Sequence, residues 1–202
     1  MNKSVKLARG IGVKGTEYPT SDSGKIKREY ALWRGMLYRC TDKMLVKYPS
    51  YSGVSCSENF KHYSFFYEWC NKQKGFENKD EKGKVWHLDK DILVKGNKTY
   101  SEDTCCFVPQ RINALLTKSE SARGEYPVGV CLITSAGKYI ARCSCGVSKQ
   151  KYLGFFNTPQ EAFQAYKTYK EALIKEVANE YKEMLDSRVY EALMNYEVNE
   201  ND

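Results

Sequence analysis

Apolar residues recur at helical spacing in two stretches of the N-terminal half of the chain. The first stretch, over residues 29–40, predicts a short amphipathic helix. Ser57 is a suitable cap for a second helix, which the aromatic residues that follow extend to Cys70. Residues 1–27 contain Lys, Gly, Ser and Thr with little apolar periodicity. We interpret them as an extended, partly mobile basic arm.

The middle of the chain has the pattern of a β-turn-β-α unit of about 30 residues. A strand is predicted at 85–89, a turn at 95–98 and a return strand or bend at 104–108. Pro109 then suits the first position of a short helix that ends near Leu116.

The last third of the chain predicts a three-stranded meander followed by one long helix. Strands are expected at 128–133, 139–145 and 151–156. The helix starts with Thr158, Pro159 and Glu161, which together form a capping-box signature. Its apolar stripe continues to Tyr181.

These elements predict an α+β fold with four parts. They are the arm (1–27), a helical region with the ββα unit (28–120), the module of three-stranded antiparallel sheet packed on a long helix (126–185), and an acidic C-terminal helix or tail (186–202). The acidic part either extends the long helix or forms another one around Val189, Leu193 and Tyr196.

Composition supports a globular chain: 42% of the 202 residues are hydrophobic and 13% are aromatic, enough for a real core. No run approaches the ~18 apolar residues of a membrane span, and the N-terminus has no apolar signal region. We therefore expect no membrane partner and a cytoplasmic location.

Charge is distributed unevenly. Of the formal net charge of +7, residues 171–202 contribute −6 and residues 1–170 contribute +13. A basic body predicts a polyanionic partner, with nucleic acid ahead of a membrane surface. The alternative is that the lysines only keep the surface soluble.

The eight cysteines do not have zinc-site spacing. They form one adjacent pair, Cys105 and Cys106, and one C-x-C, Cys143 and Cys145, with only two histidines in the chain. We expect buried, reduced thiols and no structural zinc.

Two groups of motifs resemble known families. The first resembles the HNH-type endonuclease-like proteins of phages and mobile elements. Its motifs are Trp33-Arg34-Gly35-Met36, Arg39-Cys40, Tyr51-Ser52-Gly53-Val54, Leu88-Asp89-Lys90-Asp91, Gly96-Asn97-Lys98 and Phe107-Val108-Pro109. The second, over 126–170, resembles the DNA-binding module of plant ethylene-response factors. Its motifs are Gly129-Val130, Gly137-Lys138-Tyr139, Leu153-Gly154-Phe155-Phe156, Glu161-Ala162 and Ala165-Tyr166.

The first resemblance implies a metal-dependent enzyme that nicks or cleaves double-stranded DNA with Mg²⁺ or Mn²⁺. Asp89 and Asn113 match metal-ligand positions, and Asp91, which shares a strand face with Asp89, could serve as a second carboxylate ligand. Lys90 occupies the place of the general base, and only a register shift gives that role to His87. Enzymatic activity is therefore open. The alternative is an inactive HNH-derived factor that binds DNA or protein, such as a phage inhibitor of host defence.

Each of these residues also has a purely structural interpretation. His87 can be a half-buried, hydrogen-bonded residue, and Asn113 can cap or end a helix. Asp89 and Asp91 can form an ion-pair cluster around Lys90 that caps a turn.

The second resemblance implies a sheet that contacts DNA. The candidate contacts are Lys138, Tyr139, Arg142, Lys149, Lys151 and Tyr152. Cys131, Leu132, Ile140 and Ser144 stand where arginine or polar contacts are expected, which puts base-specific readout in doubt. The alternative is a module for protein contacts, including a homodimer formed through residues 173–193.

Overall fold

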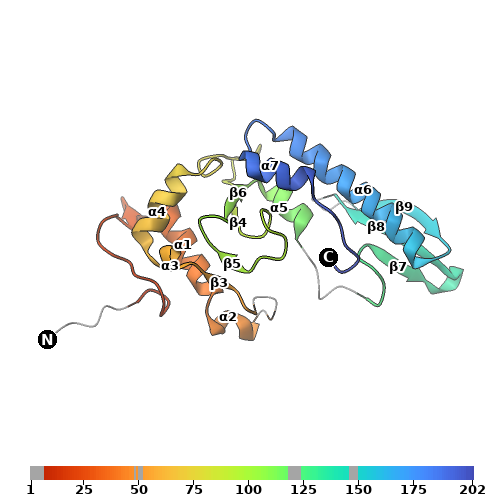
Figure 1. Cartoon of the computed structure of the whole chain (residues 1–202), viewed down its shortest axis with the longest axis horizontal. Coiled ribbons are helices and arrows are strands. Elements are labelled where there is room, and N and C mark those ends of the chain that lie inside the picture. Colours follow the sequence, from red (N-terminus) through yellow and green to blue (C-terminus); the bar gives the residue numbers. More distant parts are fainter. Residues whose placement is uncertain (1–6, 48, 50–51, 118–123, 146–149) are drawn as a thin grey trace. The chain divides into compact units, whose positions relative to one another are not determined.

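The computed structural model describes residues 7–47, 49, 52–117, 124–145 and 150–202 (Figure 1). The chain divides into two compact units. The N-terminal unit comprises Met1–Asn78 and Lys84–Phe107, and the C-terminal unit comprises Lys79–Gly83 and Val108–Asp202. Helices and strands are mixed, and a three-stranded antiparallel sheet with a following long helix lies in the C-terminal part, so the predicted α+β class is confirmed.

The described residues of the N-terminal unit form four α-helices: α1 (Arg28–Arg39), α2 (Asp42–Lys47), α3 (Glu58–Lys61) and α4 (Tyr63–Lys72). The apolar stripe predicted for 29–40 is buried, with Trp33 and Leu37 fully covered. Phe60 packs edge-on against Phe66, and Trp33 donates a hydrogen bond from Nε1 to the carbonyl of Phe60 at 2.8 Å. The aromatic residues of the two predicted helices thus form one core.

The single helix predicted from Ser57 to Cys70 is wrong, because the chain breaks at His62. Ser57 does cap the first segment, as expected, by accepting from the Phe60 N–H. His62 is extended, however, at φ −94° and ψ 120°. Val13 pairs with it in parallel: the Val13 N–H donates to Lys61 O at 2.8 Å and the Tyr63 N–H donates to Val13 O at 3.0 Å. These bonds replace helical ones at the break.

Residues 7–27 pack on the helices rather than forming an extended arm. Tyr18 stacks on Tyr67 with 4.1 Å between ring centroids and donates to Glu68 at 2.9 Å. The short strands β1 (Ser21–Asp22) and β2 (Lys25–Ile26) form a hairpin. Ser23 and Gly24 both have positive φ, as a tight two-residue turn requires.

Two small sheets complete the N-terminal unit. β3 (Ser55–Cys56) pairs in parallel with β5 (Thr99–Tyr100), and β4 (His87–Asp89) pairs with β6 (Cys106–Val108). The predicted helix α5 (Gln110–Leu116) follows, with Pro109 as its N-cap residue instead of its first residue. Because α5 belongs to the C-terminal unit, the predicted ββα segment is divided between the two units.

The C-terminal unit is built on an antiparallel sheet of β7 (Val130–Ile133), β8 (Lys138–Ser144) and β9 (Gln150–Phe156), with β8 in the middle. A 3₁₀ turn (Thr134–Ala136) connects β7 to β8. Helix α6 (Pro159–Glu180) runs along one face of this sheet (Figure 1). Its predicted capping box is present: Thr158 Oγ1 accepts from the Glu161 N–H at 3.2 Å, and the Glu161 carboxylate accepts from the Thr158 N–H at 3.3 Å.

The acidic end forms a separate helix, α7 (Ser187–Met194), which buries Val189 and Leu193. The chain then returns to the sheet: Lys167 Nζ donates to Val198 O at 2.9 Å, and the Val128 N–H donates to Glu200 O at 3.0 Å. The apolar residues of 173–193 are thus largely covered within the unit itself. Among the described residues, no helix has the length and apolar character to cross a membrane.

Candidate functional site

Asp89, the first carboxylate of the predicted metal site, closes a turn at the end of β4. Its Oδ1 accepts the backbone N–H groups of Asp91 at 2.8 Å and Ile92 at 3.0 Å. Burial and, to a smaller extent, the negative charge of Asp91 raise the pKa of Asp89 to about 6, although the two N–H donors act in the opposite direction. The carboxylate is therefore already engaged by its own backbone.

Lys90, which occupies the place of the general base, is held by the same loop. Its Nζ lies 3.2 Å from Asp91 Oδ2 and 3.2 Å from the carbonyl of Asn97, and its side chain is 15% exposed. Asn97 in turn donates from Nδ2 to the carbonyls of Lys90 and Thr99. The loop thus satisfies its polar groups internally, which matches the structural interpretation of Asp89 and Asp91.

The two remaining residues of the predicted catalytic centre are not part of this loop. His87 is half-buried on β4, two residues before Asp89. Asn113 is half-buried on α5 and belongs to the C-terminal unit. Neither unit by itself holds all the predicted ligands.

The Asp89–Asp91 loop does not fit the Mg²⁺ or Mn²⁺ that the HNH resemblance implies. Such ions need several free oxygen ligands. Here Asp89 is bonded to backbone N–H groups, and the ammonium of Lys90 neutralises Asp91. In the described ranges, no three His, Cys, Asp or Glu side chains lie together in a way that could hold a metal ion.

The β7–β8–β9 sheet has one face covered by α6. Val130, Ala141 and Cys143 are buried there against α6 residues such as Tyr166. Tyr139, one of the predicted DNA contacts, also lies on this covered face, and its ring packs edge-on against Tyr126 at 5.2 Å. Burial thus removes Tyr139 from the outward face of the sheet.

The opposite face, which we call the helix-free face, carries three of the predicted contacts. Strand alternation places Lys138, Ile140 and Arg142 of β8 on it. Arg142 is paired with Tyr152 of β9, and its guanidinium lies 5.1 Å from the centroid of that ring. Tyr152 is 60% exposed. Lys138, Arg142 and Tyr152 therefore share one surface.

The other two predicted DNA contacts are Lys151 and Lys149. Lys151 is exposed but pairs with Cys143, which places it on the side of the sheet that faces α6. Lys149, like the rest of the predicted turn 146–149, lies outside the described residues.

Phe155 is a surface residue that the sequence analysis did not select. It pairs with Ile140, which itself pairs with Cys131 of β7, so all three lie in one row on the helix-free face. Ile140 is 3% exposed in the middle of the row, whereas Phe155 at its edge is 62% exposed. The signal was present in the run Leu153–Phe156, where a glycine inside a strand indicates a bulge.

The bulge explains why Tyr152 and Phe155 share a face. Residues three apart in a regular strand point to opposite faces. Between the Ala141–Gly154 and Arg142–Tyr152 pairs, however, β9 contains one extra residue, Leu153. Gly154 has φ +130°, a conformation that favours glycine. The extra residue turns Tyr152 to the same side as Phe155.

The segment that forms this sheet carries charge of one sign. Residues 126–160 contain four basic residues (Lys138, Arg142, Lys149 and Lys151) and no Asp or Glu. The nearest acidic residues in sequence are Glu125 and Glu161, and the carboxylate of Glu161 is engaged in the capping box. The sheet is thus suited to an anionic ligand.

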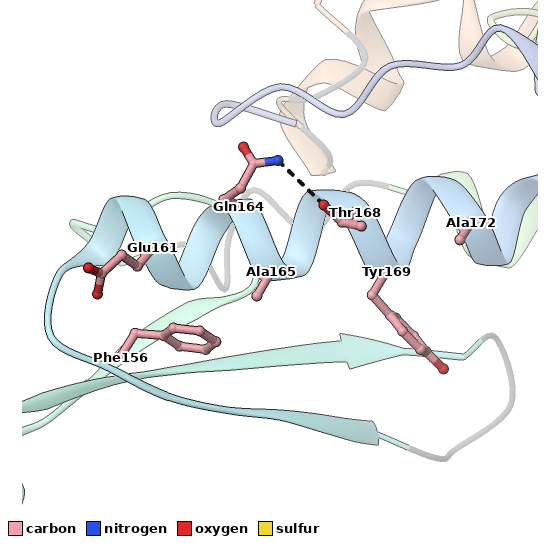
Figure 2. Close-up of a pocket in the computed structure, with 7 residues that line it drawn as sticks. All are labelled: Phe156, Glu161, Gln164, Ala165, Thr168, Tyr169 and Ala172. Atoms are coloured by element: carbon pink, nitrogen blue, oxygen red, sulfur yellow. Dashed lines mark hydrogen bonds between the residues drawn. The ribbon is translucent and has the colours of Figure 1, made fainter.

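A groove of about 660 Å³ lies elsewhere on this unit, between α6 and the end of β9. Phe156, Ala165 and Tyr169 line it, and a hydrogen bond of 3.4 Å joins Gln164 to Thr168 (Figure 2). The groove is open and apolar, and its only charged residue is the capping Glu161. Its lining therefore carries few polar groups.

No protein-family model, no curated protein and no solved structure matches this chain. Functional inference therefore depends on the residues and their geometry.

Proposed function

We propose that this protein binds DNA through the helix-free face of the β7–β8–β9 sheet and does not cleave it. The observation that carries the proposal is that Lys138, Arg142 and Tyr152 share one face of a sheet segment without acidic residues, with Lys138 and Tyr152 exposed. Positive side chains on an exposed sheet suit the phosphate backbone, which supplies most of the affinity in sequence-independent binding.

The geometry of the Asp89 turn supports the version without cleavage. A general base must be able to accept a proton, and Lys90 is instead held as a donor between Asp91 and the carbonyl of Asn97. Asp89 is occupied by two backbone N–H groups. Both contacts favour the inactive alternative of the HNH resemblance over the endonuclease.

The proposal is tested with purified protein, labelled DNA and supercoiled plasmid. We expect complexes that weaken steeply as salt rises, because bound phosphates release counterions. We expect no nicking with Mg²⁺ or Mn²⁺. Nicking that disappears in both Asp89→Ala and Asn113→Ala would establish the endonuclease instead. Absence of DNA binding at low salt would contradict the proposal and redirect the search to protein partners.

A matched pair of variants separates the sheet from general basicity. Lys138→Gln removes a cation from the helix-free face, whereas Lys175→Gln removes an exposed cation from α6 in the same unit. Only the first should weaken DNA binding. Equal effects would indicate attraction to the whole basic surface rather than to this face.

A further inference from the structure

We infer that the helix-free face takes single-stranded DNA and that unpaired bases stack on Tyr152 and Phe155. This inference rests on the proposed DNA binding and names the form of the ligand. Three observations support it: the exposed aromatic rings on this face, the position of the Arg142 guanidinium against one of them, and the apolar row that contains the other.

Tyr152 and Phe155 are the two most exposed large hydrophobic side chains on this sheet, at 60% and 62%. Their partners on β8, Arg142 and Ile140, are two residues apart, so the rings stand in adjacent rows about 7 Å apart along the strand. Exposed aromatic rings on a sheet are a stacking platform for bases, worth about 1–3 kcal/mol per base. The bulge at Leu153 and Gly154 is what brings both rings to this face.

The guanidinium of Arg142 lies against the Tyr152 ring and adds to the stacking surface, and it does not extend into the solvent. Its distance from the ring centroid is 5.1 Å. The Nε of Arg142 is buried and has no hydrogen-bond partner within the part of the chain that the structure describes. A planar guanidinium held in this way offers a stacking surface and a positive charge next to the ring. It is poorly placed to extend into a groove and read base edges with both ends of its fork.

The row that contains Phe155 is apolar from end to end. Cys131, Ile140 and Phe155 follow one another across the three strands. A duplex presents phosphates and base edges to a protein, and its base faces are covered by stacking. Unpaired bases have free faces, which an apolar and aromatic surface covers well. The row therefore suits a single strand better than a duplex.

Charge complementarity completes the argument. Lys138 lies on the same face, in the row beyond Ile140, and no acidic residue occurs in 126–160. Phosphates of a strand whose bases lie on the rings would meet positive charge at Lys138 and Arg142. A protein partner could also pack on the apolar row. Binding to a protein does not explain, however, why residues 126–160 contain no acidic residue.

The test measures fluorescence anisotropy of the full chain with a labelled oligo(dT) and with a duplex of equal length at the same salt. We expect the single strand to bind at least tenfold more tightly. Tyr152→Ala and Phe155→Ala should each weaken oligo(dT) binding by about fivefold or more. Circular dichroism checks the fold of each variant.

Two conservative variants and one control variant make the result specific for stacking. Tyr152→Phe keeps the ring and should bind like the original chain. Phe155→Leu keeps an apolar side chain but loses the ring, so it should weaken binding much as Phe155→Ala does. Phe65→Ala removes a ring that is 36% exposed in the N-terminal unit and should have no effect.

The outcomes separate this inference from the proposed function. Duplex binding that equals or exceeds oligo(dT) binding, with no effect of the ring variants, would overturn the single-strand inference and leave DNA binding standing. Failure to bind either DNA at low salt would overturn both. Tight oligo(dT) binding that Tyr152→Ala and Phe155→Ala leave unchanged would also overturn stacking on these rings.

Discussion

The two units of this protein differ in whether their candidate functional side chains are bonded within the fold or exposed to a ligand. In the N-terminal unit, Asp89 and Lys90 lie in a motif that suggests catalysis, yet both are bonded within their own loop. In the C-terminal unit, Tyr152 and Phe155 belong to no catalytic motif, yet both are largely exposed on the sheet face opposite α6. A group that the fold already uses has little capacity left for a ligand, so the outward face is the better candidate for function.

The same contrast holds for the arginines. Arg28 of the N-terminal unit donates to the carbonyls of Phe76 and Trp86, and burial lowers its pKa. Arg142 of the C-terminal unit instead lies against an exposed ring. The first is a structural cation and the second is available to a ligand.

The largest effect is expected from Gly129→Ala, which should destroy the helix-free face by unfolding its sheet. Gly129 has φ +78°, and a Cβ there would overlap the ring of Tyr166 in the core. We expect a loss of more than about 3 kcal/mol in the stability of the C-terminal unit, together with loss of DNA binding. Thermal unfolding and hydrogen exchange of β8 measure it.

Gly137→Ala is the control for this glycine. Its φ is also positive, at +59°, but nothing lies within 4 Å of the added Cβ. The cost should be about 1 kcal/mol, from backbone strain alone. Equal destabilisation by both variants would show that the Tyr166 contact does not matter.

The next effect belongs to the N-terminal unit. Arg28→Ala removes the hydrogen bonds to two carbonyls and the contact of the guanidinium with the Phe76 ring, 4.5 Å away. We expect about 2–4 kcal/mol of destabilisation, seen as faster hydrogen exchange in α1 and α4, with DNA affinity unchanged. Arg34→Ala, whose guanidinium lies over the Tyr30 ring, should cost less than about 1 kcal/mol. A large loss of DNA affinity in Arg28→Ala would break the division of roles between the units.

Asp89→Asn tests, through the pH dependence of stability, whether Asp89 has a structural role in the N-terminal unit. The pKa of Asp89 is raised in the folded state, so the folded chain binds more protons than the unfolded chain between about pH 4 and pH 6. The contribution of Asp89 to stability therefore falls as pH rises through this window. Between pH 5 and pH 7 it should lose about 1 kcal/mol, and Asp89→Asn should remove that dependence. Urea unfolding at both pH values measures it, and an unchanged pH dependence in the variant would contradict the assignment.

The smallest effect is electrostatic. Lys138→Gln should lower the slope of log affinity against log salt by about 0.7 if Lys138 contacts one phosphate of a single strand. Lys175→Gln on α6 should leave the slope as it is. A titration of anisotropy against salt for both variants decides whether Lys138 is a phosphate contact.

The C-terminal module was predictable because its signals are local. Thr158, Pro159 and Glu161 define the start of α6 within four residues, and Gly137 marks the turn between β7 and β8. The bulge at Gly154 was not recognised, since alternation alone places Tyr152 and Phe155 on opposite faces. The register with β8 was needed to bring them together.

The N-terminal unit was harder to predict because its features depend on distant pairs. The break at His62 is set by Val13, and the strand at Ser55 exists because Thr99 pairs with it. The geometry of the candidate metal site could not be predicted from the sequence for the same reason. The motif around Asp89 shows which residue types are present. Only the folded loop shows that a backbone N–H group already donates to Asp89 and that Asn97 already donates to the carbonyl of Lys90.

The most direct test of the account uses Cys131, an exposed thiol in the row of Ile140 and Phe155. The chain is alkylated with and without saturating oligo(dT), and each cysteine is followed by peptide mass spectrometry. We predict that DNA slows the modification of Cys131 severalfold and leaves the half-buried Cys40 and Cys56 of the N-terminal unit unchanged. Equal modification of Cys131 in the free and DNA-bound protein would contradict the helix-free face as the binding surface.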